Sequence, residues 1–241
     1  MRQTRYTELL TKDRYVGNIN QNTLNTTKLN KINDALIADL SIKKRETLSQ
    51  LRNARLSATE LDTFIGKLPL QNSTNEMEDA EIIAAAFSSG ISTSAQLSLG
   101  SFDTHSNNDQ NQFTVMDEYL KLVDHLWDEL ARQQVEHKTT IVLVSEFSRT
   151  PGYNTKDGKD HWPITSTVFI GAGVRGNQVI GGTDAGLNAR KVDPETLEFD
   201  EEGIELTAAH IHRAIREKSL LLNTTLDLKY PLDVESIPIF S

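Results

Sequence analysis

Residues 139–145 read TTIVLVS, an almost unbroken run of β-branched and apolar side chains. Such a run predicts a strand buried on both faces, as in the parallel sheets of α/β proteins. Helical spacing of apolar residues predicts a long amphipathic helix over 113–134, and residues 94–99 are a short strand candidate. The order strand, helix, strand favours an α/β fold with a mostly parallel sheet flanked by helices.

Further elements extend this pattern on both sides. An apolar strand is expected over 167–170 and a helix from Thr207 to about Lys218, after a glycine-rich stretch that ends at Gly182. Before them, a helix is expected over 78–88, stopped by Gly90. Residues 1–70 have the pattern of a polar arm followed by amphipathic helices, so we expect a domain boundary near residue 70 and an α/β domain over 71–241.

Charge and composition exclude several classes of function. The formal net charge of −9 argues against nucleic acid as a partner, because binding to phosphate backbones depends on clustered Lys and Arg. No stretch approaches the roughly 20 apolar residues that a membrane span needs, and we expect no signal peptide at the start of this chain. The sequence has no cysteine, so any metal site must use oxygen and nitrogen ligands.

Candidate ligands follow the two strands of the predicted crossover. Asp103 and His105 come just after the first strand, and Glu146 comes directly after the second. The carboxyl ends of parallel strands share one edge of a sheet, so these side chains could converge on one ion. Two plainer interpretations stay open: Asp103 caps a turn with His105 as a surface residue, and Glu146 forms an ion pair with Arg149.

Asp160 and His161 occupy the segment GKDHWP, ahead of the strand expected over 167–170. A parallel strand there would put both residues at its amino end, opposite the supposed site. Either the long loop from Phe147 folds back, or that strand runs antiparallel. The other histidines are expected to be structural or solvated.

Four blocks of the sequence, GSFDTHSNNDQ, IVLVSEFSRTP, GKDHWP and VRGNQVIGGTDAG, together resemble the bacterial domain-of-unknown-function family 1501. This family is a sulfatase-like branch of the alkaline phosphatase superfamily. By that resemblance, the metal ligands include Asp103, His105 and His161 around one ion, with Glu146 as an acidic ligand of a second. Asp160 is a further candidate ligand, and Arg149 would hold an anionic ester.

The same resemblance implies divalent metal ions as cofactors, with zinc as the first choice and calcium or manganese as alternatives. It also implies that the full-length family is periplasmic or secreted. Two departures, Ser148 where the family usually has Gly and Phe102 where it has Trp, leave the proposed ligands intact. The resemblance also implies an N-terminal sheet region that supplies another metal-binding Asp and the place of a nucleophile. Residues 1–100 show no sequence pattern of such a region. We therefore expect an alkaline-phosphatase-like sheet that is incomplete on its N-terminal side, and the nucleophile is unknown.

Two functions of different classes follow from these observations. The first is a metal-dependent hydrolase of phosphate or sulfate esters, acting on a small anionic ester. The alternative is a non-catalytic metal-binding or scaffold protein that has lost the nucleophile-bearing region. The sequence does not indicate an oligomeric state.

Overall fold

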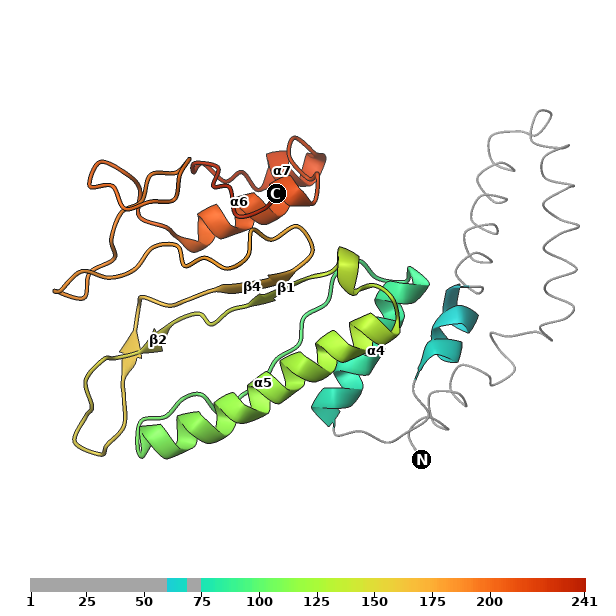
Figure 1. Cartoon of the computed structure of the whole chain (residues 1–241), viewed down its shortest axis with the longest axis horizontal. Coiled ribbons are helices and arrows are strands. Elements are labelled where there is room, and N and C mark those ends of the chain that lie inside the picture. Colours follow the sequence, from blue (N-terminus) through green and yellow to red (C-terminus); the bar gives the residue numbers. More distant parts are fainter. Residues whose placement is uncertain (1–59, 69–74) are drawn as a thin grey trace, which may run out of the picture. The chain divides into compact units, whose positions relative to one another are not determined.

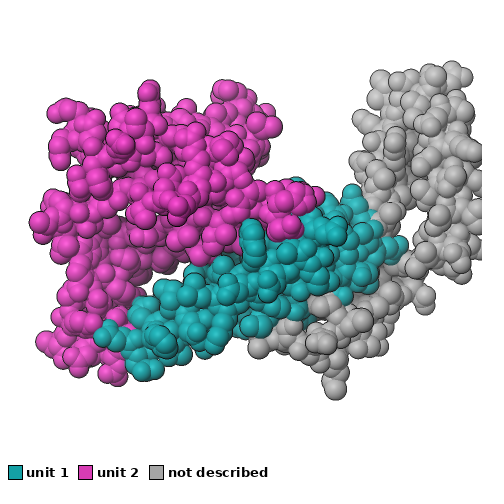
Figure 2. Space-filling view, viewed as in Figure 1, with its two compact units in different colours: residues 1–103, 109–135 teal, residues 104–108, 136–241 magenta. Residues whose placement is uncertain are grey.

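The structure is a computed structural model that describes residues 60–68 and 75–241 (Figure 1). The described residues fall into two compact units, coloured separately in Figure 2. The first includes residues up to Asp103 together with Asp109–Val135, and the second consists of Thr104–Asn108 and Glu136–Ser241. The expected N-terminal arm and most of the first amphipathic helices lie outside the described residues, as does the expected boundary near residue 70.

The first unit is helical. Residues 60–67 are helical, α4 spans Asn75–Ser89, and α5, whose first residue belongs to the second unit, spans Asn108–Arg132. α4 ends where predicted, because Gly90 takes a positive φ of 78° and the amide of Ile91 donates back to the carbonyl of Ala86. Three alanines of α4 and a stripe on α5 are fully or almost fully buried: Ala80, Ala84, Ala85, Val115, Leu122 and Leu130.

The second unit contains two small antiparallel sheets. β1 (Thr140–Leu143) pairs with β4 (Val168–Gly171), with Ile141 opposite Ile170. β2 (Ser148–Arg149) pairs with β3 (His161–Trp162), so the chain between β1 and β4 forms a hairpin. The short 3-10 helix η1 (Glu136–Lys138) precedes β1.

Two helices and the C-terminal segment complete the second unit. α6 spans Ala208–Lys218 and α7 spans Thr225–Lys229. Ala214 of α6 forms a buried cluster with Ile237 and Ile239, and Phe169 of β4 packs against it. This cluster joins α6, the sheet and the end of the chain into one core.

The mixed α/β content was predicted correctly, but the predicted parallel sheet was wrong for the part of the chain that the structure describes. There, both sheets are antiparallel and no parallel pair occurs. Residues 94–99, expected to form the first strand of a parallel crossover, are not in a strand. The physical reason is that the chain after β1 turns back through the β2–β3 hairpin, and β4 therefore returns antiparallel to β1.

Among the described helices, none has both the length and the apolar character needed to cross a membrane. The longest of them, α5, carries charged residues along its whole length.

Candidate metal centre

The β2–β3 hairpin carries a loop that is held by its own hydrogen bonds. The amide of Thr150 donates to the carbonyl of Asp160 (2.8 Å), and the amide of Asn154 donates to the carbonyl of Gly158 (2.8 Å). The side-chain oxygen of Asn154 accepts from the amides of Lys156 (2.9 Å) and Gly158 (3.0 Å). An Asn side chain that accepts from backbone amides further along the chain stabilises a tight turn. These hydrogen bonds within the loop define its shape.

This loop docks against residues 104–108 through the backbone. The amides of Asn107 and Asn108 donate to the carbonyls of Lys156 (3.2 Å) and Asp157 (2.8 Å), and the amide of Lys159 donates to the carbonyl of Thr104 (3.1 Å). Gly158 lies at the centre of the contact. A Cβ added to Gly158 would lie 2.0 Å from the carbonyl carbon and oxygen of His105, so only glycine fits there.

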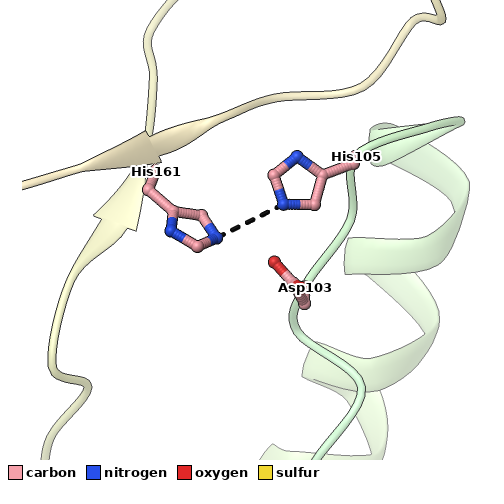
Figure 3. A group of neighbouring side chains, drawn as sticks. All are labelled: Asp103, His105 and His161. Atoms are coloured by element: carbon pink, nitrogen blue, oxygen red, sulfur yellow. Dashed lines mark hydrogen bonds between the residues drawn. The ribbon is translucent and has the colours of Figure 1, made fainter.

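Docking brings together three of the predicted ligands (Figure 3). Asp103, His105 and His161 each offer a ligand atom, and these atoms all lie within 4.8 Å of one another. The Nε2 atoms of the two imidazoles are 3.3 Å apart and point toward one another. The two ring planes are tilted by 40°, with centroids 5.0 Å apart. All three side chains are exposed, which leaves the group open to solvent.

Asp160 lies beside this group and contacts His105. Its Oδ1 is 3.1 Å from Nδ1 of His105 and 3.2 Å from the side-chain amide nitrogen of Asn154. The pKa of Asp160 is lowered from its ordinary value, first by the hydrogen bond from Asn154 and then by the hydrogen bond with His105. Asp160 is therefore an anion that accepts hydrogen bonds at neutral pH.

His161 stacks on an aromatic ring and has Arg149 as its cross-strand partner. The ring of Phe147 stacks on that of His161, with centroids 4.1 Å apart and planes 24° apart. Arg149 of β2 is the direct cross-strand partner of His161 of β3. Directly opposed residues of an antiparallel pair project to the same face, so Arg149 and His161 share a face of the hairpin. Arg149 also donates from Nη1 to the carbonyl of Lys159 (3.2 Å).

The predicted site residues thus occupy different places. Asp103, His105 and His161 form the group, Asp160 contacts it through His105, and Arg149 shares the hairpin face of His161. Glu146 is exposed at the end of the segment after β1 and is not a member of the group. No sequence pattern predicted that Phe147, Asn154 or Gly158 would contribute to the site. A turn-forming Asn followed by a Gly four residues later was the one signal for the loop's shape.

The chain matches the model of one protein family. The family described as "Protein of unknown function (DUF1501)" matches residues 18–198, which is about three quarters of the chain and includes all the residues of the site. Neither the curated proteins nor the solved structures contain a significant match.

Proposed function

This chain belongs to the DUF1501 family, and from its site we propose that it is a metal-dependent hydrolase of phosphate or sulfate esters. The observation that carries the proposal is the group formed by Asp103, His105 and His161. His161 lies 56 residues after His105 in the sequence, yet the three side chains offer ligand atoms within 4.8 Å of one another. A carboxylate and two imidazoles are a ligand set typical of zinc enzymes.

The spacing of the imidazoles fits a zinc ion. Two nitrogens bound to one tetrahedral zinc at about 2.05 Å each lie about 3.3 Å apart, and the two Nε2 atoms are 3.3 Å apart. Three protein ligands leave a fourth position open, which distinguishes a catalytic zinc site from a structural one. When bound there, the ion would lower the pKa of a water molecule and act as a Lewis acid toward the ester.

Arg149 supplies the complementary feature for an anionic substrate. Its side chain projects from the same hairpin face as that of His161, and an arginine can hold two oxygens of a phosphate or sulfate group at once. We propose that Arg149 orients the ester and stabilises its charge, while Phe147 keeps the ring of His161 in place. Glu146 remains a candidate ligand for a second ion, as the family resemblance implies.

A turnover assay tests this function. One sample of the protein is prepared with zinc, manganese or calcium, and another is treated with a chelator. Both are given an aryl phosphate, a phosphodiester and an aryl sulfate as substrates. We expect turnover of at least one ester that the chelator and His161→Ala both abolish. His212→Ala provides the matched control, because His212 is exposed on α6 and lies outside the group. Arg149→Lys is expected to raise KM for the ester and to leave metal affinity unchanged, because a lysine cannot form the bidentate contact.

Two results would contradict the proposal. Turnover that survives in His161→Ala would place the chemistry elsewhere. Tight metal binding without turnover of any ester class would support the non-catalytic metal-binding alternative instead.

A further inference from the structure

We propose that Asp160 is a positioning residue that holds the imidazole of His105 in the tautomer needed for metal binding, rather than a ligand of the same ion. This inference rests on the metal site of the proposed function and deepens it. It assigns Asp160 a role different from the ligand role expected from the sequence.

The two nitrogens of His105 face different partners. Nδ1 is 3.1 Å from Oδ1 of Asp160, whereas Nε2 is 3.3 Å from Nε2 of His161. A carboxylate at neutral pH only accepts hydrogen bonds, so the proton of a neutral His105 must reside on Nδ1. Nε2 of His105 then presents its lone pair toward Asp103 and His161, where the ligand atoms gather.

The directions of the ring nitrogens separate the two roles. Oδ1 of Asp160 lies 3.1 Å from Nδ1, and an ion bound to Nε2 would lie about 2 Å from that nitrogen, on the opposite side of the imidazole ring. We estimate the distance between Oδ1 and such an ion to be about 7 Å. That separation is far longer than a metal–oxygen bond. An ion held by Nε2 of His105 therefore lies beyond the reach of Oδ1 of Asp160.

Hydrogen bonds within the loop hold both the backbone and the side chain of Asp160 in this position. Its amide donates to Oγ1 of Thr150 (3.0 Å), and its carbonyl accepts from the amide of the same residue (2.8 Å). The side-chain amide of Asn154 donates both to Oδ1 of Asp160 (3.2 Å) and to the carbonyl of His105 (3.2 Å). Asn154 thus bridges the two members of the His105–Asp160 pair.

The orientation of the Asn154 amide follows from its partners. Both groups near its nitrogen are oxygens that only accept, and both groups near its oxygen are backbone amides that only donate. A flipped amide would oppose every one of these contacts. A residue that orients a ligand imidazole, as we propose for Asp160 and His105, commonly raises metal affinity by about 10- to 100-fold without touching the ion.

The test measures zinc affinity and the His105 tautomer in the same set of variants. Zinc affinity is measured by competition with a chelator of known affinity, and the tautomer by long-range proton–nitrogen NMR of the metal-free protein. We expect Asp160→Ala to weaken zinc binding by about 10- to 100-fold and to lose the Nδ1-protonated form. Asp160→Asn should retain that form and most of the affinity, because an amide oxygen also accepts a hydrogen bond from Nδ1.

Matched variants separate positioning from charge and from ligation. Asp157→Asn removes the same charge from an exposed position of the same loop, and asparagine tolerates the positive φ of 53° there, so zinc affinity should not change. Asp103→Ala should weaken zinc binding and leave the tautomer of His105 unchanged. If Asp160→Asn weakened zinc binding as much as Asp160→Ala does, Asp160 would be a ligand. Wild-type zinc affinity in Asp160→Ala would also overturn the proposal. If the wild type binds no zinc, the proposed metal site fails as well, whichever tautomer the NMR spectra show.

Discussion

Replacing Gly158 with alanine should separate the hairpin loop from residues 104–106 and disrupt the proposed metal centre. A Cβ at this position would lie 2.0 Å from the carbonyl carbon and oxygen of His105 and 2.4 Å from the amide nitrogen of Ser106. Ordinary contact begins at 3.4 Å, so the loop must retreat by about 1.4 Å. The φ of Gly158 is not in the left-handed region, so the effect is a steric one.

The size of the effect follows from the contacts beside Gly158. Backbone hydrogen bonds join Asp157 to Asn108 and Lys159 to Thr104 on either side of it. Losing two or three such bonds at about 1 kcal/mol each lowers the free energy of unfolding by about 2 to 3 kcal/mol. Metal–ligand distances stay within about 0.2 Å of their standard values, and the expected loop shift is several times larger. We therefore expect zinc affinity to fall by at least about 10-fold.

Urea unfolding and a zinc titration measure the two effects separately. Gly152→Ala is the matched control, because it adds the same methyl group to the same loop at an exposed position where nothing lies within 4 Å. Unfolding of Gly158→Ala at the same urea concentration as Gly152→Ala, together with wild-type zinc affinity, would contradict this prediction.

Three further variants test separate contacts. Phe147→Ala removes the ring stacked on His161 and should weaken zinc binding by about 2- to 10-fold in a competition titration, in line with the strength of aromatic pairs. Ala214→Leu overfills the core beside Ile237 and should lower the free energy of unfolding by about 1 to 3 kcal/mol in urea. Hydrogen bonds from the amide of Asn223 and then from Arg216 lower the pKa of Asp227. Asp227→Asn should therefore lower the melting temperature above about pH 5, and its difference from wild type should vanish as the pH falls through about 4 and below. A difference in melting temperature that grows on acidification would contradict this prediction.

Elements with strong periodicity could be predicted from the sequence. The helix expected over 113–134 corresponds to α5 (Asn108–Arg132), and the strand expected over 139–145 contains β1 (Thr140–Leu143). The strand expected over 167–170 is β4 (Val168–Gly171), shifted by one residue. Local hydrophobic patterns and helix-ending glycines suffice for these elements, because the same short-range contacts produce them in the folded protein.

Strand direction and pairing were not encoded in such local patterns. The run at 139–145 has the composition of a central parallel strand, yet the side chains of β1 are only partly buried and β1 pairs antiparallel with β4. Both options left open for the chain after Phe147 are realised together, since the loop folds back as the β2–β3 hairpin and the strand runs antiparallel. Pairing of this kind depends on the turn between strands as much as on the strands themselves.

The candidate site divides in the same way. Residue type and the four-block resemblance were enough to select Asp103, His105 and His161, which the fold brings together. The environment of these residues was not predictable, because it depends on how the loop docks. Asn154 and Phe147 look like ordinary loop residues in the sequence, and only the docked loop places them against Asp160 and His161.

A zinc anomalous difference map from a crystal grown with one equivalent of zinc tests the metal centre most directly. We expect a single strong peak about 2 Å from Nε2 of both His105 and His161 and within bonding distance of a carboxylate oxygen of Asp103. Asp160 should remain hydrogen-bonded to Nδ1 of His105. A crystal with no peak between the two imidazoles, or with zinc bound only at another place on the chain, would contradict the assignment of this group as the metal centre.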